Sequence, residues 1–279
     1  MATATAIRLE QEDLKPKIGS RVLNSKEELL SGELSAEIND LLERRGVLIF
    51  PKISFTDDEQ VAFTNALGGN AREIRGEEVF KVSLDTKVNS YAAEYLKGSL
   101  FWHIDGTMNK VPIRASMLSG KVLPPEGGDT QFANTATAYD ALDEETKRKI
   151  ADLRVVHSLW ISGFYHTPEP TTAQLEDWQS KGEAELPLVC THKSGRKSLV
   201  LGNTAHYVVG VDPKESARIL HGLRDFATRE DNVYTHKWSV GDTVIWDNRT
   251  SLHRATPYDP NSGRLMHRTI LKGSEAWDL

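Results

Sequence analysis

Short strand-like runs separated by turns dominate the chain, and this pattern limits the folds that it can adopt. The runs do not alternate regularly with helices, as βαβ units would, and no glycine-rich phosphate-binding loop follows any of them. The pattern therefore disfavours a doubly wound nucleotide-binding fold. It favours a mainly β protein, a double-sheet β-sandwich or jelly roll with helices packed outside. The expected strands are 47–50, 114–120, 154–160, 187–192, 198–202 and 268–273, with a hairpin over 236–248.

Helical spacing of apolar residues or a helix cap marks further segments. The expected helices span residues 26–45, 56–67, 136–153 and 212–228. Residues 166–174 contain two prolines and read as a surface loop. Because this loop is too short and too central for a linker, we expect a single domain over residues 1–279. The charged run at 72–78 is expected to be an exposed loop, part of a lid.

Composition excludes several classes of protein. With 39% hydrophobic and 27% charged residues, the chain is expected to fold rather than to be disordered. It has no apolar run long enough for a membrane span, and residues 1–14 lack the pattern of a secretory signal, so we expect a cytoplasmic protein. A net charge of −6 disfavours nucleic acid or an anionic membrane as the main partner. The single cysteine, Cys190, excludes an internal disulfide and a Cys-rich zinc site.

A His-x-Asp pair within residues 99–110 is the most informative local motif. His103 and Asp105 would point to the same face of an extended strand, where a ring nitrogen and a carboxylate oxygen could reach one metal ion. Such a short motif also occurs by chance, as a surface hydrogen bond or as a capping aspartate beside an ordinary histidine.

A second group of residues lies near the end of the chain. His253 follows a strand-like run, and Arg264 and Arg268 come shortly after it. On a strand, positions 264 and 268 would share one face, and two arginines among apolar neighbours are unusual unless they bind anions. The alternatives are a histidine bonded to a backbone carbonyl and a pair of surface arginines.

The two groups together have a chemical logic. Two histidines and one carboxylate on one face of a metal leave three open positions, as in non-haem Fe(II) oxygenases. A bidentate 2-oxo acid and O₂ could occupy those positions. The distal carboxylate of the 2-oxo acid would then need a planar, two-pronged cation, which arginine provides better than lysine.

In this order and spacing, the motifs resemble the taurine dioxygenase/aryloxyacetate dioxygenase (TauD/TfdA) family of Fe(II)- and 2-oxoglutarate-dependent oxygenases. The resemblance covers most of the chain and is densest in residues 102–107, 123–142 and 238–259. Residues 187–202 are more similar to the aryloxyacetate branch than to the taurine branch.

The resemblance implies a role for each matching position. The positions that match the iron ligands are His103, Asp105 and His253. Those that match the residues around 2-oxoglutarate and the iron are Thr130, Arg264 and Trp246, although a turn threonine and a core tryptophan are the ordinary alternatives. The expected contacts to the prime substrate are Arg268, His157 and Ser158.

The resemblance also implies a fold and a reaction. The fold would be a distorted double-stranded β-helix, a cupin-like jelly roll with flanking helices. The reaction would convert 2-oxoglutarate and O₂ to succinate and CO₂ while hydroxylating a small or medium organic anion, such as an aryloxyalkanoate-like carboxylate. Hydroxylation beside an ether oxygen would cleave the substrate. A homo-oligomer, a dimer or a tetramer, is expected from the family.

Two departures leave the prime substrate open. No histidine matches the one that helps to hold the sulfonate in the taurine branch, and Met108 stands where relatives often carry an aromatic residue. One alternative keeps the cofactors but performs desaturation, epoxidation or ring formation in a natural-product pathway. A remote alternative is a non-catalytic β-sandwich that binds an anion.

Overall fold

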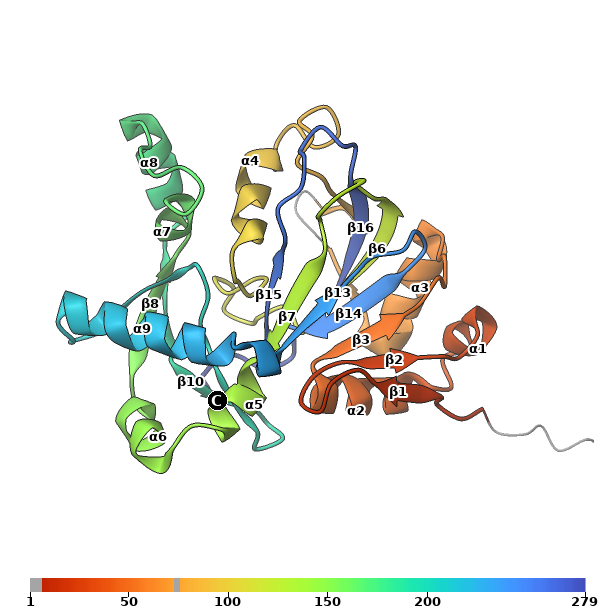
Figure 1. Ribbon diagram of the computed structural model, residues 1–279, viewed down its shortest axis with the longest axis horizontal. Helices are drawn as coiled ribbons and strands as arrows, with labels where there is room; N and C mark the ends of the chain where they lie inside the picture. The colour runs from red at the N-terminus through yellow and green to blue at the C-terminus, as the bar shows by residue number, and fades with distance from the viewer. Residues whose placement is uncertain (1–6, 73–75, 279) are drawn as a thin grey trace, which may run out of the picture.

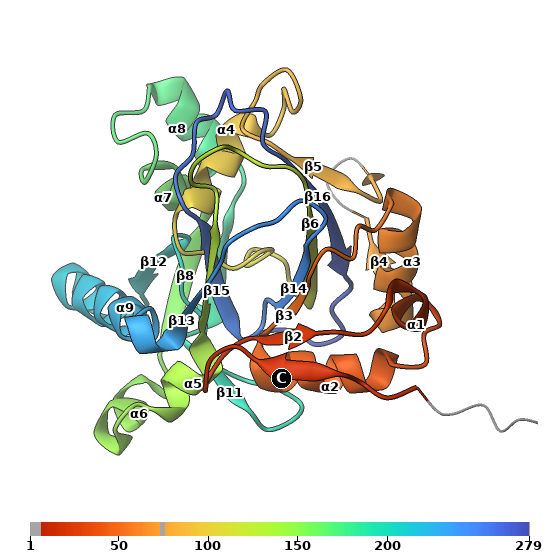
Figure 2. The ribbon, with the colours of Figure 1, turned by 45° about the vertical axis from the view of Figure 1, so that its right-hand side comes forward.

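Two mainly antiparallel sheets form the centre of the protein, for which a computed structural model describes residues 7–72 and 76–278 (Figures 1 and 2). The strand order of the larger sheet is β1 (Gln11–Asp13), β2 (Ser20–Val22), β3 (Val47–Phe50), β14 (Thr243–Asp247), β6 (Ala115–Val122), β16 (Leu265–Leu271) and β4 (Asn70–Ala71). A further strand, β5 (Phe80–Val82), pairs with β16. The order of the smaller sheet is β13 (Val233–His236), β7 (Thr130–Asn134) and β15 (Ser251–Ala255). Within the larger sheet, β2 and β3 pair in parallel.

Apolar side chains fill the space on both sides of the larger sheet. In β3, Val47 and Ile49 belong to the cluster that contains Phe132 of β7, whereas Leu48 and Phe50 join the cluster beneath the N-terminal helices. The run is apolar at every position because both of its faces are covered. The mostly sheet architecture with packed helices agrees with the coarse prediction from the sequence.

Three helices cover the outer face of the larger sheet (Figure 2). They are α1 (Lys26–Leu30), α2 (Ser35–Arg45) and α3 (Asp57–Gly68). The predicted single helix over 26–45 is wrong, because the chain turns at Gly32, which has a φ of +79°. The prediction for α3 is confirmed: Thr56 caps the helix by accepting the N–H of Glu59, whose carboxylate accepts the N–H of Thr56.

A third sheet and its helices pack beside the smaller central sheet. The strands of this third sheet are β12 (Ala205–Val208), β8 (Arg154–Ser158) and β9 (Glu183–Pro187). A separate hairpin consists of β10 (Val189–Thr191) and β11 (Lys197–Leu199). The remaining helices are α4 (Ala93–Leu96), α5 (Thr135–Asp140), α6 (Glu144–Ile150), α7 (Leu159–Gly163), α8 (Thr172–Gln179), α9 (Pro213–Ala227) and the 3-10 turns Lys97–Leu100 and Glu230–Asn232.

Several boundaries differ from those expected. Residues 236–248 are not a hairpin, because β13 pairs with β7 while β14 pairs with β3 and β6, in the other sheet. The strand expected over 154–160 ends at Ser158, where α7 follows directly. The helix expected over 136–153 is divided into α5 and α6, and α8 begins within the expected loop at 166–174.

Two expectations fall partly outside the described residues. These are the absence of a signal, which concerns residues 1–14, and the lid at 72–78, of which residues 73–75 lie outside the description. None of the helices in the described ranges combines the length and the apolar character that a bilayer-crossing helix needs.

Candidate metal centre and adjoining cavity

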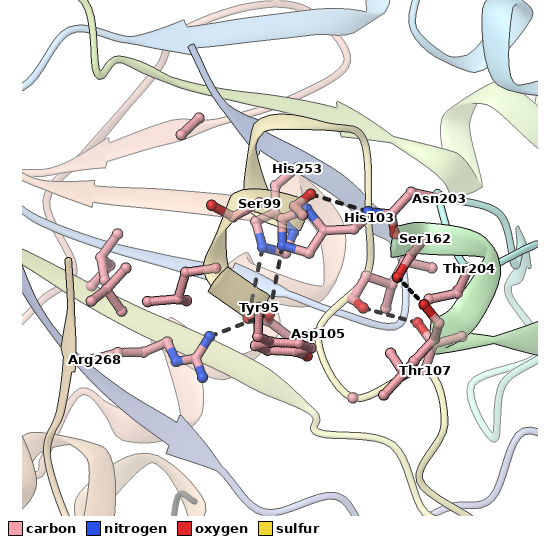
Figure 3. Close-up of a pocket in the computed structure, with 18 of the residues that line it drawn as sticks. Tyr95, Ser99, His103, Asp105, Thr107, Ser162, Asn203, Thr204, His253 and Arg268 are labelled. Atoms are coloured by element: carbon pink, nitrogen blue, oxygen red, sulfur yellow. Dashed lines mark hydrogen bonds and ion pairs between the residues drawn. The ribbon is translucent and has the colours of Figure 1, made fainter. Parts of the chain in front are cut away.

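His103, Asp105 and His253 come together at one point (Figure 3). One ligand atom from each lies within 4.8 Å of the others. The Nε2 atoms of His103 and His253 each lie 3.7 Å from a different oxygen of the Asp105 carboxylate. Two ring nitrogens and a carboxylate are therefore directed at a common centre, as the sequence predicted.

The backbone that positions this triad differs from the expected strand. His103 forms an isolated bridge to His253, in which each main-chain N–H donates to the carbonyl of the other residue at 3.0 Å. Asp105 lies in the turn that follows, and Gly106 has a φ of +70°. The turn, and not i and i+2 positions of a strand, brings Asp105 to the histidines.

A chain of hydrogen bonds holds the Asp105 carboxylate. Ser116 of β6 donates to Asp105 Oδ2 at 2.6 Å, and Asn248 Nδ2 donates to Ser116 Oγ at 3.0 Å. Trp246 Nε1 in turn donates to Asn248 Oδ1 at 3.0 Å. Sequence reasoning missed Ser116 and Asn248. The one signal for Asn248 was its place two residues after Trp246.

The protonation states suit a cation. Burial by itself raises the pKa of Asp105, but Arg268, the two histidines and Ser116 outweigh it and hold the pKa well below its usual range. Burial lowers the pKa of both His103 and His253, and the pKa of His253 falls further because His103 lies beside it. At neutral pH the centre therefore offers two neutral imidazoles and one carboxylate, a donor set that binds divalent metals.

A cavity of about 220 Å³ adjoins the triad. Trp246, Thr130 and Arg264, the residues expected around 2-oxoglutarate and the iron, all line this cavity. Trp246 is both a core residue and a wall of the site, because its buried ring lies 4.6 Å from the ring of His253.

Arg264 brings an unneutralised charge into the protein. Arg264 is buried, with only 3% of its surface exposed. Its guanidinium lies 4.7 Å from the ring centre of Tyr258, and its Nη2 donates to the carbonyl of Gly128. Its buried Nε has no hydrogen-bond partner, and among the described residues the group that acts on its charge is Tyr258 and not a carboxylate. Since burying a charge without a counterion is costly, this end of the cavity is built to receive an anion.

Arg268 lines the same cavity from β16 and lies beside the triad (Figure 3). Its Nη1 is 3.4 Å from Asp105 Oδ1, and its guanidinium lies 5.2 Å from the ring centre of Phe80. The expectation that both arginines face one cavity is confirmed. The regular strand face is not, because Arg264 precedes β16 and the register shifts at Leu265–Met266.

The structure does not place His157 and Ser158 in the cavity. Both side chains are fully buried behind its wall, and His157 Nδ1 lies 3.0 Å from the hydroxyl of Thr204, which does line the cavity. Burial lowers the pKa of His157 to about 3, so this ring is neutral. The two residues are thus not part of the cavity lining, and their contact with the prime substrate stays a prediction. Cavity-lining residues that the sequence did not reveal include Tyr95, Ser99, Leu159, Ser162, Asn203 and Thr204.

The fold and the site thus define a protein with a candidate mononuclear metal centre beside an anion pocket. The chain matches the family described as "Taurine catabolism dioxygenase TauD, TfdA family" over residues 10–270. It therefore belongs to the TauD/TfdA family, which confirms the resemblance inferred from the motifs.

Relatives and solved structures agree with this assignment. The chain is 36% identical over 241 residues to an (S)-phenoxypropionate/alpha-ketoglutarate-dioxygenase of Sphingobium herbicidovorans, covering 82% of this chain and 83% of that one. It is 34% identical over 286 residues to an alpha-ketoglutarate-dependent 2,4-dichlorophenoxyacetate dioxygenase of Cupriavidus pinatubonensis, covering 94% and 93%. A crystal structure of AAD-2 with Mn(II) and N-oxalylglycine superposes with a TM-score of 0.83 at 32% identity, covering 97% and 99%.

Proposed function

We propose that this chain is an Fe(II)- and 2-oxoglutarate-dependent dioxygenase that hydroxylates a small or medium organic anion and releases succinate and CO₂. The observation that carries the proposal is the meeting of three metal-ligand atoms within 4.8 Å, beside a buried arginine without a carboxylate partner among the described residues. A non-catalytic anion-binding sandwich would need the arginine but not the triad.

The residues present fit the metal and the cosubstrate. His103, Asp105 and His253 would hold iron(II), which with 2-oxoglutarate and O₂ supplies the oxidant for C–H cleavage when bound. Asp105 is kept ionised and is oriented by Ser116. Arg264 would form a two-pronged ion pair with the distal carboxylate of 2-oxoglutarate, and Thr130 would donate its hydroxyl to the same group.

The remaining cavity favours a substrate with one anionic end. Arg268 is the cation on the side of the triad, and Val82, Leu96, Met108, Leu118 and Leu159 supply apolar walls. Across the cavity from Arg268, the hydroxyls of Thr107 and Ser162 already donate to the carbonyls of Ile104 and Leu159 (Figure 3). Those two hydroxyls offer only lone pairs to a ligand, which disfavours a second anion there.

An aryloxyalkanoate-like carboxylate meets these requirements. Its carboxylate would pair with Arg268 and its ring would lie against the apolar walls. The relatives from Sphingobium and Cupriavidus are named for phenoxypropionate and 2,4-dichlorophenoxyacetate. Hydroxylation of the carbon that carries the ether oxygen would give an unstable product, so the overall result would be cleavage of the ether.

We also propose that the two facing sheets form the distorted double-stranded β-helix of a jelly roll and that residues 1–279 make up one domain. The shared cluster of Phe132, Trp246 and Met266 between the sheets supports this architecture. A cytoplasmic homo-oligomer, a dimer or a tetramer, remains a prediction from the family.

Anaerobic spectroscopy tests the cofactor assignment. Purified protein with Fe(II) and 2-oxoglutarate should develop a weak visible charge-transfer band, and His103→Ala should lack it. A wild-type protein without the band, or a band that survives in His103→Ala, would contradict the proposal.

Product analysis then tests the reaction. A panel of aryloxyalkanoates, other carboxylates and sulfate esters should release succinate only with accepted substrates. A product mass that gains one oxygen, or the phenol from ether cleavage, supports hydroxylation. A product that has lost two hydrogens would indicate desaturation instead.

A further inference from the structure

One hydrogen bond near the Arg264 end of the cavity constrains the direction of the Thr130 hydroxyl proton. The indole Nε1 of Trp238, two residues after β13, donates to the hydroxyl oxygen of Thr130 at 3.0 Å. An indole N–H can only donate, so the Thr130 oxygen must be the acceptor in this pair. The proton of the Thr130 hydroxyl is therefore directed elsewhere.

The cavity is where that proton can find an acceptor. Thr130 is 4% exposed and lines the cavity. It lies on β7, between the neighbouring strands β13 and β15. Among the residues that the structure describes, no group accepts its hydroxyl proton. The buried Nε of Arg264, in the same cavity, is a second donor without a partner.

Two neighbours, Gly120 and His236, fix the indole of Trp238. A Cβ atom added at Gly120 would lie only 3.2 Å from Cε3 of the indole, so glycine leaves the room that the ring fills. The ring of His236 meets the indole edge-on, with centres 4.6 Å apart and planes at 85°. His236 Nε2 lies 3.2 Å from the carboxylate of Asp242, which also accepts the main-chain N–H groups of Lys52 and Ser239.

We propose that Trp238 is a positioning residue for 2-oxoglutarate, acting through Thr130. By occupying a lone pair of the Thr130 oxygen, Trp238 turns the hydroxyl into a donor aimed at the distal carboxylate. Hydrogen bonds in such a chain polarise one another, so the threonine donates more strongly than a free hydroxyl would. The inference rests on the proposed function, because it assigns Trp238 to the cosubstrate end of that site.

Calorimetric titration of the full chain with 2-oxoglutarate, in the presence of Mn(II) and without O₂ turnover, tests this role. Trp238→Phe keeps an aromatic side chain and removes the indole N–H, and it should weaken binding about five- to tenfold, the factor for one net hydrogen bond. Thr130→Val should weaken binding by at least as much. The double variant should bind no more weakly than Thr130→Val alone, because Trp238 acts only through that hydroxyl.

Two controls separate positioning from general damage. Trp160→Phe removes an indole N–H that donates to Glu183, and it should leave 2-oxoglutarate affinity unchanged. The second control is 2-oxobutanoate, which lacks the distal carboxylate and should bind wild type and Trp238→Phe equally. In turnover, Trp238→Phe should raise the KM for 2-oxoglutarate while kcat and the KM for the prime substrate stay near wild type.

Each other outcome overturns the inference. Unchanged affinity in Trp238→Phe, equal weakening for 2-oxobutanoate, or multiplied effects in the double variant would each exclude a role through Thr130. If wild type itself binds no 2-oxoglutarate, the proposed function fails together with the inference. If Trp238→Phe does not fold, Gly120→Ala, which would press the same indole by a few tenths of an ångström, should weaken binding in the same direction, and unchanged binding in that variant would overturn the proposal.

Discussion

The main chains of His103 and His253 exchange two hydrogen bonds, each 3.0 Å long, although the two residues are far apart in the sequence. This bridge fixes the separation of the two candidate ligands through the backbone rather than through flexible side chains. The centres of the two imidazole rings lie 4.0 Å apart, and both Nε2 atoms face the Asp105 carboxylate. The folded backbone therefore holds the two candidate ligands side by side.

Because folding brings the three candidate ligands together, a metal bound there should stabilise the folded chain. At a free metal concentration about 100 times Kd, linkage adds about 2.7 kcal/mol to the free energy of unfolding and raises Tm by roughly 5 °C or more. Chelation should reverse the rise. In scanning calorimetry, His253→Ala should show no metal-dependent shift. An equal shift in that variant would mean that the metal binds elsewhere.

The bond from Ser116 to Asp105 predicts an effect on metal affinity from a residue that is not itself a ligand. Ser116→Ala removes a 2.6 Å hydrogen bond to Oδ2, so the carboxylate loses its fixed orientation. Metal affinity measured by competition with a chelating dye should fall about 10- to 100-fold. Ser119→Ala is the matched control on the same strand, because Ser119 bonds to Thr243 instead. Similar losses in both variants would point to damage of β6.

Removing the charge of Arg249 and removing the charge of Arg264 should have different effects on the stability of the ligand-free protein. Arg249 pairs with Asp247 and Glu275, so Arg249→Gln should destabilise the protein by about 3–5 kcal/mol by leaving buried carboxylates unpaired. Arg264 has no carboxylate partner among the described residues, so Arg264→Gln should leave the ligand-free protein as stable or more stable. The same variant should lose 2-oxoglutarate binding by about two orders of magnitude or more. Urea unfolding and calorimetry measure the two effects, and marked destabilisation by Arg264→Gln would contradict the prediction.

The lowered pKa of the buried His157 predicts that the folded protein loses stability in mild acid. Burial lowers its pKa to about 3 in the folded protein, whereas an unfolded histidine titrates near its ordinary value. The unfolded chain therefore binds a proton that the folded chain refuses. The contribution to stability is fully present above about pH 6.5 and is lost as the pH falls toward 3, at up to about 1.4 kcal/mol per pH unit. Replacing His157 with glutamine should flatten the dependence of unfolding free energy on pH between 4 and 6. An unchanged slope would mean that other groups control it.

The sequence was sufficient for the parts of the site in which residue type determines chemistry. His103, Asp105, His253, Arg264 and Arg268 all lie at the cavity, because metal and anion binding permit few substitutes. The sequence could not reveal Ser116 and Asn248. A serine on a strand has no special pattern, and its value depends on which strands pair.

Long-range pairing also explains the errors in the fold. Residues 236–248 have the local pattern of a hairpin, yet β13 and β14 each find partners far away in the chain. The break between α1 and α2 depends on the positive φ of Gly32. The helical spacing of the leucines gives no indication of that backbone conformation. His157 follows the apolar pattern of its strand, so its side chain is buried and is not among the residues that line the cavity.

The two ends of the cavity are lined by different kinds of element, strands at one end and short helices at the other. Thr130, Trp246 and His253 are on strands of the paired central sheets, whereas Tyr95, Leu159 and Ser162 are on short helices outside them. Substitutions in those helices can reshape the substrate end without moving a strand that supports the metal. The architecture thus separates what must stay constant for oxygen chemistry from what can diverge, and directed evolution toward new organic acids should begin in α4 and α7.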